Sequence, residues 1–483
     1  MRSITSLIVL ACFSIQAALA DGLPDLGDSS QTTLSMQQER AIGESVMREI
    51  RASDDFLDDP DITAYINSLG YKLAAASQDP AIPFEFFVVN DKSINAFAMP
   101  GGFIGVHAGI FLTAQSESEL AGVLGHEIAH VTQHHLARRA EVQSKMSVPL
   151  LAAMALAILA ARSSSNTDPG MGVLATSQAL GASASLAYSR DHEREADRLG
   201  LQTLSKAGFD PRAMPRFLER MQRAYALLDN NAFPYLRSHP LTTERVADTQ
   251  SRVDLLPYRQ VTDSQDFLLI REKLRVMQNG GKASVQYYEY TLAEKKYTQE
   301  IAYRYGLALA LLKDRHYERA QQEINRARQQ WQHPLLETLA GDIQLAMNQP
   351  EQAEKLFSAG LLRYPGSAGL YLGKVEAQLR LAQARSALEM INERLSLTPG
   401  DARLYQLQAR AHASLKEPAK EHQALAEYHW LRGNPMEAQT QLKIALDSAK
   451  GNFYLQSSLE ARLREMRRAL AVDNNQKKPR DEP

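Results

Sequence analysis

The sequence predicts a mainly α-helical protein with two different halves. In the first half, short apolar and β-prone runs between residues 84 and 106 interrupt helical segments, which predicts an α+β arrangement with a small β-sheet. A histidine-rich stretch with a helical pattern, Leu120–His135, follows these runs. Beyond about Ser264 the pattern is almost wholly helical and periodic, which predicts a solenoid of stacked helix pairs.

Residues 1–20 have the pattern of a secretory signal peptide. Arg2 supplies a positive end, Ile4–Ile15 an apolar run, and Ala18-Leu19-Ala20 a small-residue cleavage site. The run is too short to span a bilayer. Lipoprotein processing at Cys12 is the alternative, because the residues before it loosely resemble a lipobox. Either interpretation predicts export.

The composition limits what can hold this protein together and what it can bind. Cys12 is the only cysteine, so the mature chain would lack disulfides, and any metal would be held by histidine and carboxylate. The formal net charge is −2 and no basic block stands out, which argues against a nucleic-acid partner.

The first half begins with two predicted helices and continues with three predicted strands. An edge strand of such a sheet could pair with an extended peptide, although an ordinary structural hairpin fits the sequence equally well. The helices are predicted at Met36–Arg51 and Asp61–Ser77, and the strands at Phe84–Val89, Ile94–Met99 and Phe103–Val106.

The stretch His126-Glu127-Ile128-Ala129-His130 carries the clearest chemical signal. In a helix, His126 and His130 lie four residues apart on one face, so both imidazoles can reach one ion. Glu127 projects beside them and could take a proton from a water molecule at the metal. Zinc suits such a site, because it accepts neutral nitrogen and carboxylate ligands and keeps one position open. The alternative is an amphipathic helix that happens to hold two histidines.

The helix itself is predicted independently of the motif. Ser116 followed by Glu119 has the pattern of a capping box. Three neighbouring histidines, His107, His134 and His135, are predicted to be bystanders; Val131 stands where a second motif would need a base.

An apolar segment, Ser147–Ala161, follows and is shorter than a membrane-spanning helix requires. We expect a buried helix or a flap over the site; peripheral contact with a membrane or a hydrophobic client is the alternative. Ser163–Gly172 is predicted to be a flexible loop.

A second charged helix is predicted over Leu186–Ala207, with Gly208 ending it. Within it, Glu193 and Asp197 share a face, whereas Glu195 points roughly the opposite way. Glu193 is therefore the natural third metal ligand, and Asp197 could accept a hydrogen bond from a ligand imidazole. The alternative is a solvated charged face.

The motif HEIAH, followed about sixty residues later by a helical EREAD and preceded by a signal peptide, resembles the M48 family of zinc metallopeptidases over roughly Met36–Val253. The resemblance implies a zincin-like domain with one zinc bound by His126, His130 and Glu193, and with Glu127 as general base. Many members of the family have membrane-spanning helices, whereas this chain shows none after its signal.

His239 precedes Pro240 and is predicted to lie in a loop, because a residue before proline is pushed away from helix. The resemblance favours a place near the metal. There the imidazole could fill the open position of zinc as a gate, or steady the oxyanion of the reaction.

The second half has the period of tetratricopeptide repeats. Three alanines at equivalent positions, Ala320, Ala353 and Ala387, are spaced by 33 and 34 residues. Ala438 arrives half a repeat out of phase, which predicts a capping or odd helix after about four repeats. No residue of the stack suggests chemistry, so we expect it to bind partners.

The predicted domains are a signal peptide (1–20), a zinc metallopeptidase domain (21–262), a repeat domain (263–472) and a disordered tail (473–483). We expect a zinc endopeptidase whose peptidase domain folds without the repeats. The resemblance further implies assembly and quality control of outer-membrane proteins in the periplasm of a Gram-negative bacterium, with the β-barrel assembly machinery docked on the repeats. The competing interpretation is a chaperone or adaptor with a rarely active metal site.

Overall fold

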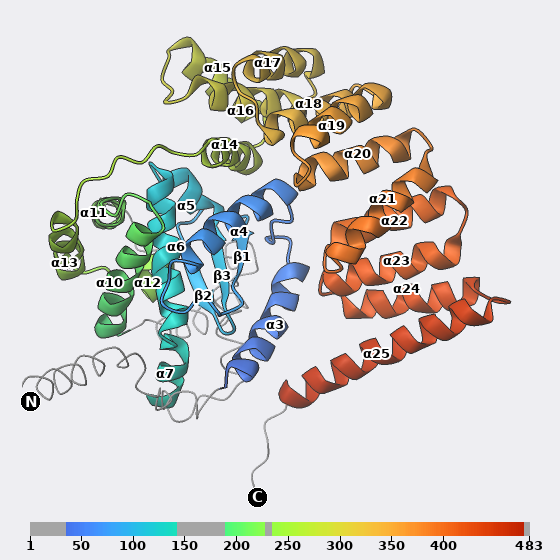
Figure 1. Cartoon of the computed structure of the whole chain (residues 1–483), viewed down its shortest axis with the longest axis horizontal. Helices are drawn as coiled ribbons and strands as arrows, with labels where there is room; N and C mark the ends of the chain where they lie inside the picture. Colours follow the sequence, from blue (N-terminus) through green and yellow to red (C-terminus); the bar gives the residue numbers. More distant parts are fainter. Residues whose placement is uncertain (1–34, 143–188, 228–233, 478–483) are drawn as a thin grey trace, which may run out of the picture.

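The computed structural model describes residues 35–142, 189–227 and 234–477 (Figure 1). The predicted signal peptide with Cys12, the apolar segment Ser147–Ala161 and the loop Ser163–Gly172 lie outside these residues. The predicted fold class is confirmed: helices and one small sheet form the first half, and helical repeats form the second. No helix among the described residues combines the length and apolar character needed to cross a membrane.

The sheet has three strands, in the order β1-β3-β2. β1 (Glu85–Val89) runs parallel to β3 (Phe103–His107), and β2 (Ala96–Met99) pairs with β3 antiparallel. Their bounds lie within two residues of those predicted. Gly105 of β3 lies between two phenylalanine rings, so that a Cβ there would come within 2.7 Å of the Phe87 ring. β2 pairs with one described strand only and is therefore an edge of the sheet.

Five helices precede residue 143 among the described residues of the peptidase half. The central one, α6, is buried at every position from Glu117 to His130 and packs on α4, β2 and β3. Only half of the predicted capping box is present: the Ser116 hydroxyl accepts from the Glu119 amide, but Glu119 accepts from the Gln115 amide instead. The five are α3 (Met36–Ala52), α4 (Pro60–Ala74), α5 (Ala108–Thr113), α6 (Glu117–Thr132) and α7 (His135–Val142).

The next helix, α10 (Arg190–Lys206), lies along α6 in close backbone contact. Gly200 allows this approach, since a Cβ there would lie 2.9 Å from the backbone nitrogen of His126. α10 ends just before Gly208, which has a φ of 87° that favours glycine. In the part of this half that the structure describes, α10 is followed by α11 (Ala213–Leu227), α12 (Pro234–Ser238) and α13 (Thr243–Asp254).

The second half begins with α14 (Gln265–Asn279) and α15 (Gly281–Ala293), followed by four helix pairs. The first helices of the pairs start at residues 300, 334, 368 and 402, each 34 after the last. The pairs are α16 (Glu300–Lys313) with α17 (Tyr317–Gln330), α18 (Pro334–Ala346) with α19 (Pro350–Arg363), α20 (Ala368–Arg380) with α21 (Ala384–Leu397), and α22 (Ala402–Ser414) with α23 (Pro418–Leu431).

The alanines that revealed the period, Ala320, Ala353 and Ala387, are fully buried between helices. α24 (Pro435–Ser448) carries the out-of-phase Ala438, also fully buried, and packs on α23 and on the last helix, α25 (Phe453–Lys477). α25 therefore continues through residues 473–477 of the tail that was predicted to be disordered.

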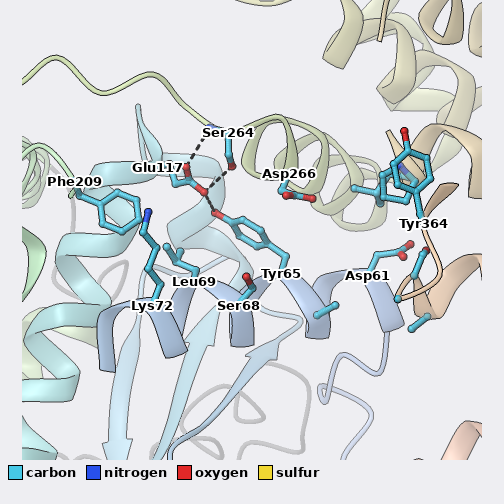
Figure 2. Close-up of a pocket in the computed structure, with 16 residues that line it drawn as sticks. Asp61, Tyr65, Ser68, Leu69, Lys72, Glu117, Phe209, Ser264, Asp266 and Tyr364 are labelled. Carbon is cyan, nitrogen blue, oxygen red and sulfur yellow. Dashed lines mark hydrogen bonds between the residues drawn. The ribbon is translucent and has the colours of Figure 1, made fainter. Parts of the chain in front are cut away.

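The two halves meet along α4 and α14. Lys273 of α14 is only 14% exposed, and its Nζ lies 2.8 Å from both Asp59 Oδ1 and Asp61 Oδ2 at the start of α4. At the other end of the junction, Glu117 accepts hydrogen bonds from the hydroxyls of Tyr65 and Ser264 (Figure 2). Asp61, Tyr65, Glu117 and Ser264 also line a cavity of about 480 Å³, which lies between α4, the start of α18 and the connection from α19 to α20.

Candidate metal centre

Four side chains from three places in the chain converge in the centre of the peptidase half. His126 and His130 come from α6, Glu193 from α10, and His239 directly follows α12; each offers one ligand atom, and these atoms all lie within 4.8 Å of one another. All four side chains are buried, with at most 2% of their surface exposed. The structure therefore brings together every residue for which the sequence suggested a place at a metal.

The spacing of these atoms fits a tetrahedral ion. His126 Nε2 lies 3.0 Å from His130 Nε2 and 3.3 Å from His239 Nδ1, and Glu193 Oε1 lies 3.0 Å from His239 Nδ1 and 3.5 Å from His130 Nε2. Ligands of a tetrahedral zinc, with bonds of about 2.0–2.1 Å, lie about 3.3 Å apart. The donor set of imidazoles and one carboxylate also suits zinc.

Asp197 contacts the imidazole of His126 on the side that faces away from the centre of the cluster. Its Oδ1 lies 2.9 Å from His126 Nδ1, so that it can accept the Nδ1–H and leave Nε2 of His126 facing the centre. This is the contact expected from the face that Asp197 shares with Glu193.

Arg245 of α13 is a residue of the site that the sequence analysis missed. Its guanidinium donates to Asp197 through Nε (2.7 Å) and Nη2 (2.8 Å), and Nη1 lies 2.6 Å from Glu193 Oε2. One buried cation thus fixes both carboxylates. A single sequence holds no signal for it, since Arg245 lies about fifty residues from either partner.

The electrostatics of the cluster favour a cation at its centre. Burial opposes the charged form of His126, but the hydrogen bonds to Asp197 and Glu193 prevail and raise its pKa to about 9. Burial holds the pKa of His130 well below its usual value. Burial alone would raise the pKa of Glu193, but His239 and Arg245 hold it well below its usual range. Glu193 and Asp197 exceed the charge of Arg245 by one, and the raised pKa of His126 shows that a proton on this imidazole offsets the excess in the metal-free site. A metal ion bound to His126 would replace that proton.

Glu127 lies beside the cluster rather than in it. It is fully buried, its Oε1 lies 3.4 Å from His239 Nε2, and burial raises the pKa of its carboxyl. The backbone of Ala98, in the edge strand β2, contacts this carboxylate and favours its ionised form. The edge of the sheet therefore passes directly by the candidate base.

His239 is placed by the short helix before it. Its amide donates to the Tyr235 carbonyl (2.8 Å), so the residue closes a helical turn, and its ring stacks on the Tyr235 ring with centroids 4.6 Å apart. His107 lies elsewhere, with its Nδ1 2.9 Å from the Ser93 hydroxyl, as expected of a bystander.

A buried cluster of three histidines and one glutamate, with the Glu127 carboxylate beside it and a small sheet next to it, fits the centre of a metallopeptidase. Residues 60–253 match peptidase family M48, and residues 344–411 match a tetratricopeptide repeat family. The chain belongs to family M48 and is a metalloendopeptidase with tetratricopeptide repeats.

Relatives cover both halves of the chain. The β-barrel assembly-enhancing protease of Escherichia coli is 34% identical over 464 residues, which are 93% of this chain and 92% of that protein. A putative β-barrel assembly-enhancing protease of Vibrio cholerae is 38% identical over 62% of each chain. The mitochondrial metalloendopeptidase OMA1 of Schizosaccharomyces pombe is 30% identical over 41% of this chain and 54% of its own length.

Proposed function

We propose that this protein is a zinc endopeptidase of the Gram-negative periplasm that degrades misassembled outer-membrane proteins and assists their assembly. The observation that carries the chemistry is the buried cluster of His126, His130 and Glu193 with Glu127 beside it. The cellular role is supported by the name of the Escherichia coli relative, which matches nearly the whole chain. Export by residues 1–20 belongs to the same proposal.

In this proposal His126 and His130, through Nε2, and Glu193 bind one zinc ion, and Asp197 and Arg245 orient them. Zinc, when bound, acts as a Lewis acid that polarises the scissile carbonyl and makes water more acidic. Glu127 takes the proton of the attacking water and returns it to the leaving amine. His239 and Arg245 hold the pKa of Glu193 low, so that this carboxylate stays ionised and available as a ligand at neutral pH.

The edge strand β2 is the proposed place for the substrate. An extended peptide that adds to the free edge of β2 would lie next to Ala98, whose backbone contacts Glu127. The repeats, which carry no chemically suggestive cluster among their described residues, would bind clients or the β-barrel assembly machinery.

A direct test of the proposal uses the purified mature chain and a denatured outer-membrane β-barrel protein. We expect cleavage that stops on chelation and returns with added zinc. A globular protein in its native state serves as the control substrate. Cleavage that resists removal of the metal would contradict the proposal.

The mature chain should contain one zinc, and His126→Ala, His130→Ala or Glu193→Ala should each lower the occupancy, because three protein ligands are the usual set for a catalytic zinc. Zinc per chain, measured by atomic emission after gel filtration, checks this. Asp191→Ala is the matched control, since Asp191 lies on the same helix as Glu193 and is exposed. Full zinc content in Glu193→Ala would rule out the ligand assignment.

His239 is proposed to gate the site. Its Nδ1 lies 3.3 Å from His126 Nε2 and 3.0 Å from Glu193 Oε1, where it would exclude the attacking water, and the four side chains of the cluster are buried. A client that favours the outward position of His239 would then open the site. This closed arrangement is also what favours the second candidate function, a chaperone or adaptor that seldom cleaves.

His239→Ala should therefore keep zinc and raise basal proteolysis, including self-cleavage, because the fourth position becomes free for water. The rate of self-cleavage over time, followed by gel electrophoresis, measures this. If His239 instead steadies the oxyanion, its loss should lower turnover by about a hundredfold or more. A zinc-bound but inactive variant would refute the gate and support the oxyanion role.

A further inference from the structure

His135, which was predicted from the sequence to be a bystander, contacts a proposed zinc ligand. It is the first residue of α7 and is fully buried. Its Nδ1 lies 2.9 Å from Nδ1 of His130, on the side of that imidazole that faces away from the centre. Its other nitrogen, Nε2, lies 3.1 Å from Glu195 Oε2, which also accepts a hydrogen bond from Arg138 Nη1 at 3.0 Å.

The chain is shaped locally to make this contact. α6 ends at Thr132, and His134 adopts a φ of 50°, in the left-handed region that most side chains avoid. Because the chain reverses at His134, His135 lies against the last turn of α6, and its ring contacts that of His130. The His135 ring also stacks on His192 of α10, with centroids 4.4 Å apart and an interplanar angle of 17°.

If His130 binds a metal, the hydrogen bonds between His130, His135 and Glu195 can run in one direction only. His130 Nε2 faces the centre and must be unprotonated to act as a ligand, so the ring proton is on Nδ1. This N–H donates a hydrogen bond to His135. His135 Nδ1 then accepts this hydrogen bond, so the ring proton of His135 is on Nε2. That N–H in turn donates a hydrogen bond to Glu195 Oε2. The hydrogen bonds from His135 and Arg138 lower the pKa of Glu195 and so keep this carboxylate ionised.

We propose that His135 is a positioning residue of the metal centre, which orients His130 and fixes its tautomer, with Glu195 holding His135 in turn. His126 has the equivalent support from Asp197, so each of the two histidine ligands on α6 would have its own acceptor. The inference rests on the proposed zinc site. Loss of such a supporting contact typically lowers metal affinity about 10- to 100-fold.

The test compares two amides that differ only in where they place a polar group. His135→Asn puts its carbonyl oxygen near the position of Nδ1, where it can accept from His130. His135→Gln places its amide near the position of Nε2 and removes that acceptor. We expect His135→Gln to bind zinc about 10- to 100-fold more weakly than wild type, and His135→Asn to stay within a few-fold of it.

The readout is the zinc dissociation constant of the full chain, from competition with a chromogenic chelator at fixed pH, together with the melting temperature of the metal-free protein. His192→Phe is the packing control, because it keeps a ring against His135 and makes no contact with His130 in this scheme. Glu195→Ala should weaken zinc binding less than His135→Gln does.

Equal zinc affinities for His135→Gln and His135→Asn, or a His135→Gln affinity equal to that of wild type, would overturn the inference. If either amide variant does not fold, Glu195→Ala decides, because an unchanged dissociation constant in that variant overturns it as well. A wild-type chain that binds no zinc at all would instead refute the proposed function.

Discussion

Glu127→Gln is expected to keep zinc and the wild-type fold and to lose proteolysis by a factor of about 10²–10⁴ or more. The amide has nearly the shape of the carboxylate, so the packing around this fully buried side chain is retained. It cannot take a proton from water, and that is the step assigned to Glu127. The cleavage rate of a denatured β-barrel protein, with zinc content measured in parallel, checks the prediction.

Glu127→Asp is the matched control for that substitution. It keeps the basic group but withdraws it by about one bond length, so it should retain a fraction of the activity that the amide lacks. Residual cleavage near the wild-type rate in Glu127→Gln would contradict the assigned mechanism. If Glu127→Gln instead lost zinc, the result would not test the role of Glu127 as a base. It would show that Glu127 helps to hold the metal ligands in place.

The same variant separates the two candidate functions. A protease that removes misassembled clients should lose its cellular effect in Glu127→Gln. A chaperone or adaptor with a rarely active site should still promote assembly of a β-barrel protein. Comparing the assembly and the degradation of one client in cells that express each form distinguishes them.

Local spacing explains how much of the site could be predicted from sequence. The two histidines of the motif lie one helical turn apart, and Glu193 and Asp197 lie one turn apart on another helix, so helical periodicity alone places each pair on a face. That the two faces meet depends on the close packing of α6 and α10 at Gly200. A single sequence does not show this contact, and only the resemblance to family M48 suggested it.

Residues that reach the site through tertiary structure gave no such signal. Arg245 arrives through the packing of α13 on α10, and His135 through a chain reversal at His134. Both support a ligand without belonging to a motif of fixed spacing. By contrast, the repeats were predictable, because each helix pair buries its apolar face on its neighbours and the period is written in the sequence.

The boundary between the halves is where sequence reasoning is weakest. The pattern places α14 with the repeats, after a cut between residues 262 and 263. In the structure, one continuous hydrophobic core joins residues of α4, α6, α14 and the first repeats. A helix with apolar residues on several sides can serve both halves, and periodicity does not tell which neighbours it has.

A chain truncated after residue 262 is therefore expected not to fold, contrary to the independent peptidase domain that the sequence suggested. The cut removes α14, whose buried side chains include Phe267 and Leu274, both with no exposed surface. Each large apolar side chain of this kind contributes about 1.5–3 kcal/mol when buried, so losing several of them approaches the whole stability of a domain, about 5–15 kcal/mol.

The cut would also leave polar groups of the peptidase half without their partners. Asp59 and Asp61 would lose Lys273, and Glu117 would lose the hydroxyl and amide of Ser264. Lys273, Asp59 and Asp61 are 11–18% exposed, so losing their ion pairs costs less than breaking a fully buried pair. This electrostatic loss adds to the apolar one.

The matched variant is a chain that ends after Asn279 and so keeps the whole of α14. It should be more soluble and more resistant to urea than the shorter chain, and should retain zinc, because every proposed ligand precedes residue 240. Circular dichroism, urea titration and zinc content compare the two truncations with the full chain. A chain ending at residue 262 that folds cooperatively and binds zinc would show that α14 is dispensable and would restore the boundary at residue 262.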